Sequence, residues 1–589
     1  MTGFRLASTL AVLASLAPAC SSAGDDPLDG ENDGFASGKA DGGIDPTSAE
    51  AQAVLALVND PDVDFAELDD DAALNATAAD RIFQHRDGAD GEAGTSDDDP
   101  FDDLAELDAV PFVGNVALER LLAYAIANGY LVESGDTTTD VIFSPQPSGQ
   151  THNARVAQLI GTAEHTIDIA MYSFSDAGIS TALAAAVDRG VEVRFLFETA
   201  SEDRKLDGSA LQGSKSGKLE QVGVDVRWVN KIMHHKFMIV DGPRDTLDAA
   251  VDAVLVSGSG NWSSSAGTIY DENTLFLEGH TELVLRMQQE FEHLWTHSRE
   301  LAADPTLTSR PSELTITDEM IEDGPDTHAY FTSANFDITG TDTFTVRGRS
   351  EIGDALVEAI EGATDSIHVA SGHLRLRPVA EALMAKAAER PDMDIRVYLD
   401  GQEYISEATH DIQVEELEDC IAAAGTSASK LRDCNDKGFL FGYLVGESGI
   451  DVRYKYYAYR WDASYAKQMH HKYMIIDGDE LWTGSFNLSD NAEHNTFENM
   501  LVFRGSASTD LVAQYEANFE DMWEAGRAEG LLAALIAEID EGGDFPLVFD
   551  AMALVHAEVD DLKDRILDGC PAVSSEPFRT SPASHQFCR

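Results

Sequence analysis

Two short segments of the sequence carry the same three chemically active side chains at the same spacing, His-x-Lys-x4-Asp. The first segment is "MHHKFMIVDG" and the second is "MHHKYMIIDG". An imidazole can attack phosphorus, a second imidazole can deliver and remove a proton, and an ammonium can neutralise phosphoryl oxygens. The pair of segments therefore supplies groups for nucleophilic and acid–base chemistry, together with positive charge, twice in one chain. The six residues are His234, Lys236, Asp241, His470, Lys472 and Asp477.

A second matching set follows each segment, first Gly-Ser-x-Asn and then a Glu-Asn pair. The Ser-to-Glu spacing is 13 residues in both copies, whereas the His-to-Ser spacing is 25 residues in the first copy and 15 in the second. We expect the ten extra residues, within "GPRDTLDAAVDAV", to lie in a surface loop. Asparagine amides can hold phosphoryl oxygens, and a glutamate can fix the tautomer of an imidazole. These supporting residues are Ser259, Asn261, Glu272, Ser485, Asn487 and Glu498.

The histidine and the lysine of each motif are expected on one face of a buried strand, because residues i and i+2 of a strand share a face. The runs "FMIV" and "YMII" that follow are apolar and β-prone, as a buried strand requires. His235 and His471 then point to the opposite face and pack behind the motif. Asp241 and Asp477 complete the motifs, and we expect them to brace the local structure rather than touch the phosphate.

The two motifs lie in two copies of a larger pattern. In the first copy, "TIDIAMYSF", "GISTALAAAVDRG" and "VEVRFLFE" predict a strand, a helix and a strand. In the second copy, "DSIHVASGHLRLRPVAEALMAKAAERPDMDIRVYLD" predicts the same order. Each copy closes with a helix that carries Phe-x-x-x-Trp. Alternating strands and helices predict an α/β fold, with one α/β sandwich in each half.

This paired set of residues resembles the phospholipase D superfamily, also called the HKD family, over residues 140–525. The resemblance implies two sandwich lobes related by a pseudo-twofold axis, with a single active site at the seam of a monomer. It also implies a covalent phosphohistidine, with His234 as the nucleophile and His470 as the acid and base. No metal cofactor is required for catalysis, because the lysines supply the positive charge. Tyr172 and His373 are candidates for the walls of the pocket.

The rest of the chain divides by composition and pattern. The expected segments are a signal peptide (1–20), a disordered acidic linker (21–47), a small all-α domain (48–135), the first repeat (140–300), a linker (301–345), the second repeat (346–525) and a helical tail (526–589). Within the all-α domain, "VPFVGNVALERLLAYA" resembles a helix-hairpin-helix module, whose turn amides near Val113 to Asn115 can bind a phosphate; a purely structural or protein-contact role is the alternative. The acidic loop 87–103 suits a structural calcium ion, and a solvated loop is the alternative.

The N-terminus and the cysteines predict export. Arg5 and the apolar stretch "LASTLAVLASLAPA" have the form of a signal peptide. Cys20, in "LAPACSS", resembles a bacterial lipoprotein processing site, which implies a lipid-anchored protein of the outer membrane or cell surface; simple cleavage and secretion is the alternative. The remaining cysteines form two close pairs, and in an oxidising compartment they are expected to be the disulfides Cys420–Cys434 and Cys570–Cys588.

Three functions remain open for this chain of 589 residues. The first is hydrolysis of the head-group phosphodiester of glycerophospholipids. The second is a secreted nuclease, which the helix-hairpin-helix resemblance favours and the net charge of −66 opposes, because that charge repels nucleic acid over most of the surface. The third is an inactive phosphate-binding scaffold, against which the intact catalytic set argues. A cardiolipin synthase is disfavoured, because no second apolar stretch approaches membrane-spanning length.

Overall fold

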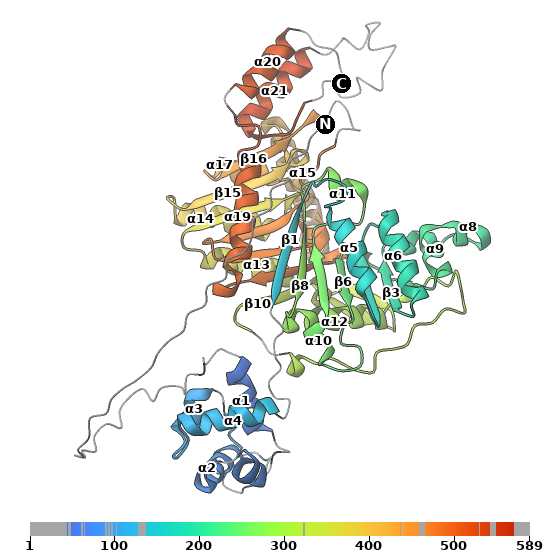
Figure 1. Cartoon of the computed structure of the whole chain (residues 1–589). Coiled ribbons are helices and arrows are strands. Elements are labelled where there is room, and N and C mark those ends of the chain that lie inside the picture. Colours follow the sequence, from blue (N-terminus) through green and yellow to red (C-terminus); the bar gives the residue numbers. More distant parts are fainter. Residues whose placement is uncertain are drawn as a thin grey trace, which may run out of the picture. The chain divides into compact units, whose positions relative to one another are not determined.

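The chain forms two compact units, Met1–Leu131 and Val132–Arg589 (Figure 1). The computed structural model describes residues 44, 49–60, 63, 65–72, 74–88, 91, 95, 98–101, 103–127, 137–321, 324–435, 438–458, 466–528, 530–541 and 549–569. In this part of the chain, no helix combines the length and apolarity needed to cross a bilayer.

The first unit consists of short helices around a small apolar core. Its elements are α1 (Ala49–Asn59), a π-helical turn (Glu67–Asp71), α2 (Ala76–Arg86), α3 (Leu104–Ala109) and α4 (Asn115–Ala127). The side chain of Asn75 caps α2 by accepting a hydrogen bond from the Thr77 N–H at 2.8 Å. A short turn joins α3 to α4, as a helix-hairpin-helix requires, but phosphate binding by this turn stays a prediction.

The second unit contains two eight-stranded mixed sheets with equivalent strand orders, so the duplication is confirmed (Figure 1). The first sheet runs β1 (Thr138–Ser144), β8 (Glu272–Glu278), β7 (Val254–Gly258), β6 (Lys236–Val240), β2 (Thr166–Met171), β3 (Glu192–Phe197), β4 (Asp225–Trp228) and β9 (Arg299–Glu300). The second runs β10 (Thr327–Phe331), β21 (Asn499–Phe503), β18 (Glu480–Gly484), β17 (Lys472–Ile476), β13 (Ser366–Ser371), β15 (Asp394–Asp400), β16 (Asp451–Tyr456) and β22 (Met552–Val555).

Helices and short strands complete each lobe. The first lobe has α5 (His152–Thr162), α6 (Ala177–Asp188), α7 (Ala200–Asp203), α8 (Gly208–Gly213), α9 (Lys215–Gln221), α10 (Ala249–Asp252), α11 (Ser264–Thr268), α12 (Thr281–Thr296) and the strand β5 (Ile232–Met233). The second lobe has α13 (Glu351–Gly362), α14 (Arg377–Glu389), α15 (Glu407–Ala424), α16 (Ala428–Asn435), α17 (Gly442–Glu447), α18 (Asp490–Asn495), α19 (Thr509–Trp523), α20 (Leu531–Asp540) and α21 (His556–Asp568). Its short strands are β11 (Phe336–Thr339), β12 (Thr343–Val346), β14 (Leu374–Arg375), β19 (Leu488–Ser489) and β20 (Thr496–Phe497).

The two lobes share one apolar core. It combines Phe237 of β6 and Tyr473 of β17 with Phe291 of α12 and Phe519 of α19. The other faces of the sheets have separate cores, with α5 and α6 against the first sheet and α13 and α14 against the second. The helices that carry Phe-x-x-x-Trp therefore pack where the lobes meet, and this shared core fixes the two motif strands relative to each other.

Two expected boundaries are wrong. The linker 301–345 contains β10, which is the edge strand of the second sheet and pairs with β21, and it also contains β11 and most of β12. The tail 526–589 is not only helical, because β22 pairs with β16 at the opposite edge. β10 has five residues and β22 has four, and segments this short carry too little of the alternation of apolar and polar residues to be told from a loop.

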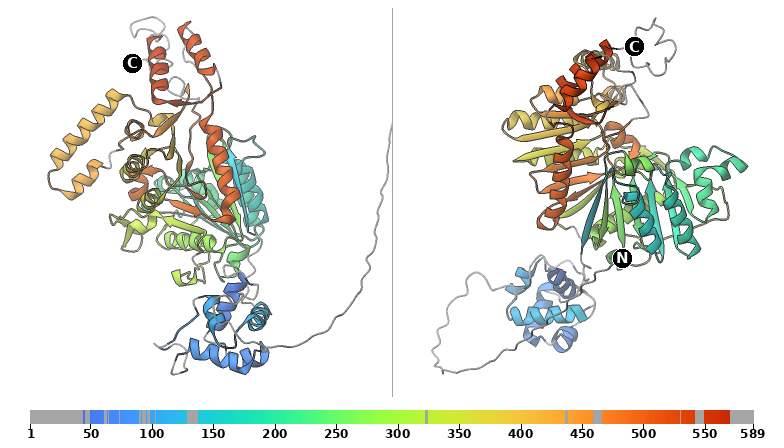
Figure 2. Two further views of the ribbon diagram at one scale, coloured as in Figure 1. Left: turned by 90° about the vertical axis from the view of Figure 1, so that its left-hand side faces the viewer. Right: turned by 45° about the horizontal axis from the view of Figure 1, so that its top comes forward.

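One of the two expected disulfides lies within the described residues. Cys420 of α15 and Cys434 of α16 are bonded, with 5.7 Å between their Cα atoms. This bond joins the two helices of a hairpin that projects from the second lobe (Figure 2). Cys20, Cys570 and Cys588 lie outside the described residues.

The loop lengthened after the first motif is not only a surface loop. Arg244 is 2% exposed and donates to the buried carboxylate of Asp168, which also pairs with Arg194 at 2.6 Å. Burial by itself raises the pKa of Asp168, but the two guanidiniums outweigh it and hold this pKa well below its usual range. Part of the insertion therefore anchors β2 from behind.

We predict that Asp168→Asn destabilises the second unit by roughly 3–5 kcal/mol, because two guanidiniums lose a shared buried counterion. Urea unfolding measures the change. The pKa of Asp168 is lower in the folded state than in the unfolded state. The stabilisation is therefore present when the pH is above the pKa of the unfolded state, and it is lost as the pH falls through the pKa of the folded state. Asp245→Asn removes the partner of Arg310 at a half-exposed pair and serves as the control. Equal losses in both variants would contradict the prediction.

Candidate active site

Backbone hydrogen bonds that cross between the lobes bring the two motifs together. β5 pairs in parallel with β20, and the N–H of His234 donates to the carbonyl oxygen of Phe497 at 3.1 Å. At the corresponding place in the other half, the N–H of His470 donates to the carbonyl oxygen of Asp271 at 2.9 Å. The motif glutamate directly follows each of these carbonyls, so each histidine lies beside the glutamate of the opposite lobe.

The histidine–glutamate pairs are accordingly crossed. His234 Nδ1 lies 2.7 Å from Glu498 Oε1, and His470 Nδ1 lies 2.8 Å from Glu272 Oε2. Both glutamates are fully buried. Because Nδ1 is committed to a carboxylate, Nε2 is the nitrogen of each imidazole that remains for chemistry. The sequence indicated that these glutamates orient the histidines, and the structure adds that each one acts across the seam.

The two motif lysines lie in the same buried cluster. The Nζ atoms of Lys236 and Lys472 each donate to the carbonyl oxygen of the histidine two residues earlier, at 2.6 Å. Both ammoniums lower the pKa of His234 and also that of His470, and His470 contributes to lowering the pKa of His234. The motif side chains of the two lobes are therefore close enough to interact, as action at one shared phosphorus would require.

Burial favours the neutral forms of these groups. Desolvation first, and then the lysine charges, lower the pKa of both motif histidines well below its usual value. Desolvation raises the pKa of each of the two glutamates to about 7. It also lowers the pKa of Lys236 to about 7 and that of Lys472 to about 8. A phosphodiester anion opposes the shifts of the histidines and lysines, because it stabilises positive charge on the groups around it.

Asp241 and Asp477 lie at turns that follow the motif strands, and both have a φ of 53°. The Asp241 carboxylate accepts hydrogen bonds from three consecutive backbone N–H groups at the start of β2, between 2.7 and 2.9 Å. The Asp477 carboxylate does the same at the start of β13. These carboxylates join neighbouring strands, so the structure gives them a bracing contact rather than a place beside the imidazoles.

In each supporting set, the contacts of the serine differ from those of the asparagine. Ser485 Oγ donates to Glu498 at 2.7 Å, and Ser259 Oγ accepts from the backbone N–H of Asn273 at 2.9 Å. The side-chain Oδ1 atoms of Asn261 and Asn487 are buried, without a hydrogen-bond partner among the residues that the structure describes. The serines are thus committed to protein groups, whereas these amide oxygens are not.

A second layer of crossed contacts supports the motif strands. His235 and His471 are fully buried behind the motifs, where the sequence indicated they would pack. Asn499 Nδ2 lies 3.0 Å from His235 Nδ1, and Asn273 Oδ1 lies 3.0 Å from His471 Nδ1. The sequence analysis assigned no role to the two asparagines. Each copy has one of them directly after its motif glutamate, and this repetition could have identified them.

The two sides of the site differ. The ring of Tyr172 lies 4.5 Å from that of His234, between ring centres, and 5.2 Å from Lys236 Nζ. On the other side His373 contributes to lowering the pKa of His470, and its Nδ1 lies 2.9 Å from the buried carboxylate of Glu403. Both pocket candidates therefore lie beside a motif histidine, one on each side. The pseudo-symmetric site thus has an aromatic wall and a polar wall.

His152 is a further buried residue near the site that sequence reasoning missed. Its Nε2 lies 2.9 Å from the backbone oxygen of Asn261. Burial lowers the pKa of His152, and the charge of Glu272 opposes this shift. The second copy has no histidine at the start of α13, so the duplication offers no signal for it.

Comparison with known proteins shows which family the two motif sets belong to. The family model described as "Cardiolipin synthase, PLD-like domain" matches residues 156–295 and 356–523. Mitochondrial cardiolipin hydrolase of Danio rerio is 35% identical over 158 residues, 26% of this chain and 62% of that protein. The enzyme of the same name from Chlamydomonas reinhardtii is 31% identical over 144 residues, 24% of this chain and 56% of that protein. The chain thus spans between half and two thirds of the length of these curated relatives.

Solved structures give partial matches. Nuc from Salmonella typhimurium, a phospholipase D family member, is 25% identical; the match covers 28% of this chain and 98% of that chain, with a TM-score of 0.23. Phosphatidylserine synthase of Haemophilus influenzae is 11% identical; the match covers 65% of this chain and 86% of that chain, with a TM-score of 0.40. The family model covers just over half of the chain and includes both complete motif sets. The chain therefore belongs to the phospholipase D superfamily, with two such domains in one polypeptide.

Proposed function

We propose that this protein is a phosphodiesterase that hydrolyses the head-group ester of glycerophospholipids. The observation that carries the proposal is the crossed pairing of His234 with Glu498 and of His470 with Glu272. It leaves the Nε2 atom of each imidazole available for chemistry among the described residues, in a cluster that also contains two ammoniums. A nucleophile, a proton donor and countercharge for the phosphoryl oxygens are thereby present in one buried site.

In the first step, Nε2 of His234 attacks phosphorus and forms a P–N bond. The bond from phosphorus to the head-group oxygen breaks, and that oxygen takes the proton carried by Nε2 of His470, so the head group leaves as an alcohol. The negative charge of Glu498 stabilises His234 as its ring becomes positive. Lys236 and Lys472 neutralise the non-bridging oxygens, whose charge grows in the transition state.

In the second step, Nε2 of His470, now neutral, takes a proton from water. The water oxygen attacks phosphorus, the P–N bond breaks, and phosphatidate leaves while His234 returns to its neutral form. Glu272 stabilises His470 while its ring is protonated, before the first step and again after it has taken the proton from water, as the aspartate of a Ser-His-Asp triad does for its histidine. The assignment of His234 as nucleophile follows the family resemblance, since the two sides of the site are nearly symmetric.

Phospholipid is favoured over nucleic acid as the substrate by two observations. Curated relatives at 31–35% identity are named cardiolipin hydrolases. The net charge of −66 opposes the approach of a long polyanion.

The disulfide between Cys420 and Cys434 supports the proposal that the protein is exported, because such bonds persist in oxidising compartments. Attachment through a lipid on Cys20 is part of the same proposal.

A substrate panel tests this function. The purified chain is offered phosphatidylcholine vesicles, cardiolipin vesicles, and single- and double-stranded DNA, all in EDTA. Release of a head-group alcohol together with phosphatidate is the expected result. Cleavage of DNA without lipid hydrolysis would support a nuclease instead. Retained binding of phosphodiesters without turnover of any of them would support an inactive scaffold.

We predict a narrow pH optimum for kcat/KM between about 7 and 8. The glutamates, with pKa values of about 7, must be ionised to hold the imidazoles, so the rate rises as the pH passes this value. Lys236 and Lys472, with pKa values of about 7 and about 8, must be protonated, so the rate falls above it. The measurement is the pH profile with a soluble phosphodiester. A rate that is constant through this window would contradict the prediction.

A further inference from the structure

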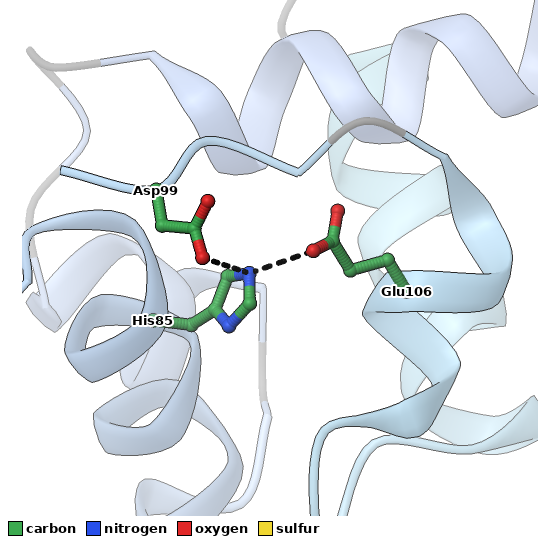
Figure 3. Close-up of side chains that lie close together, drawn as sticks. All are labelled: His85, Asp99 and Glu106. Atoms are coloured by element: carbon green, nitrogen blue, oxygen red, sulfur yellow. Dashed lines mark ion pairs between the residues drawn. The ribbon is translucent and has the colours of Figure 1, made fainter.

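The first unit contains a cluster of three side chains that the phosphodiesterase site does not use. His85 lies in the last turn of α2, Asp99 lies in the segment before α3, and Glu106 lies in the first turn of α3. Each offers one ligand atom, and these atoms lie within 4.8 Å of one another. Among the residues that the structure describes, this is the only such group of three. Figure 3 shows the two carboxylates on either side of one imidazole nitrogen.

The contacts of this nitrogen, His85 Nε2, do not have the geometry of a hydrogen bond. His85 Nε2 lies 3.3 Å from Glu106 Oε1 and 3.9 Å from Asp99 Oδ2. The atom is buried, yet it makes no hydrogen bond within the described part of the unit. An imidazole nitrogen buried in this way costs free energy unless another group binds to it. A cation between the three side chains would satisfy the nitrogen and could bind one oxygen of each carboxylate.

The three side chains are held in place by other contacts. The ring of His85 stacks on Phe101, with 4.3 Å between ring centres. The backbone N–H of Asp99 donates to the carbonyl oxygen of Arg86 at 2.9 Å. The backbone N–H of Glu106 donates to Asp103, the N-cap of α3, at 2.8 Å. These contacts fix the ligand-bearing segments before an ion arrives, which lowers the ordering cost of binding.

We propose that His85, Asp99 and Glu106 bind one divalent transition-metal ion of the zinc type. Zinc binds one imidazole nitrogen and carboxylate oxygens at about 2.0–2.2 Å, so tetrahedral ligands stand roughly 3.3–3.6 Å apart. The His85–Glu106 distance already has this value, and the Asp99 oxygen lies only a few tenths of an ångström beyond it from the same nitrogen. With three protein ligands, water completes the coordination.

The donor set differs from the oxygen-only set expected for calcium in the loop 87–103. A nitrogen ligand favours zinc and its neighbours in the periodic table, whereas calcium takes oxygen ligands alone. Three other acids of this segment have protein contacts of their own: Asp87 pairs with Arg86, Asp98 accepts from Thr95, and Asp103 caps α3. The ion would join the end of α2 to the start of α3 and stabilise a small apolar core.

Calorimetric titration of the metal-stripped full chain with Zn²⁺ tests the site. We expect about one ion per chain, and His85→Gln is expected to weaken its binding by roughly tenfold or more. His165→Gln is the matched control, because His165 is exposed and lies outside the cluster. Binding that is equally strong in the wild type and in His85→Gln would overturn the proposal, as would the absence of Zn²⁺ binding.

A spectroscopic measurement identifies the ligands independently of affinity. Co²⁺ in a tetrahedral site with a nitrogen ligand gives visible absorption bands, and these should change in His85→Gln and in Asp99→Asn while the far-ultraviolet circular dichroism stays that of the wild type. Bands that are the same in both variants would place the ion elsewhere and overturn the proposal. Saturation by Ca²⁺ that blocks Zn²⁺ binding would overturn it in favour of an oxygen-only site.

Discussion

Replacing His470 by Ala is expected to lower the rate of phospholipid hydrolysis by about 10²–10⁴-fold, while attack by His234 remains possible. The variant lacks the proton donor for a poor leaving group, but a p-nitrophenyl phosphodiester needs no such proton. We therefore expect one rapid burst of p-nitrophenolate per chain, followed by very slow turnover, because no base activates the water. The measurements are burst kinetics and mass spectrometry of the trapped phosphohistidine.

His234→Ala is the informative counterpart of this variant. It removes the nucleophile, so both the burst and the turnover should vanish, a loss of roughly 10⁴-fold or more. His165→Ala, at an exposed histidine, controls for the loss of an imidazole as such. A burst in His234→Ala and none in His470→Ala would exchange the two roles. Full activity in either variant would contradict the mechanism, because both imidazoles act at the same phosphorus.

The residue types of the site could be predicted from the sequence because the chemistry constrains them locally. His-x-Lys on a buried strand places two side chains on one face, and the duplication repeats them. The crossing of the pairs could not be predicted in this way. It depends on the hydrogen bonds from His234 to Phe497 and from His470 to Asp271, which join segments about 200 or more residues apart. Such pairing follows from how the lobes pack, and no local pattern records it.

The sequence predicts the fold correctly where strands are buried on both faces. The prediction fails at the edges of the sheets. The central strands β2, β3, β13 and β15 are buried almost throughout, and the sequence predicts each of them. β10 and β22 pair on one side only, and at these places the sequence predicts a linker and a helical tail instead. Arg244 also departed from expectation, since a charged residue in a loop rich in Asp ordinarily faces solvent. Its burial depends on Asp168, which lies 76 residues earlier.

The crossed pairs lead to a second prediction with a large effect. Glu272→Gln is expected to resemble His470→Ala, although the two residues lie in different lobes, because Glu272 holds the His470 ring. By the same reasoning, Glu498→Gln is expected to resemble His234→Ala. Each change removes the charge that stabilises an imidazolium and puts in place of an acceptor-only carboxylate an amide that no longer dictates the tautomer, so a loss of about 10²–10⁴-fold in kcat is expected.

Double-variant kinetics separate this crossed arrangement from one in which each lobe supports its own histidine. Adding Glu272→Gln to His470→Ala should lower the rate little further, since the glutamate then has no ring to hold. Adding it to His234→Ala should lower the rate further, because it changes a different histidine–glutamate pair. Glu290→Gln is the matched control: Glu290 pairs with the buried His235 at 3.2 Å, so its loss should lower stability far more than kcat. If Glu272→Gln is instead redundant with His234→Ala, each glutamate serves the histidine of its own lobe, and the seam does not form the site in the way that the hydrogen bonds indicate.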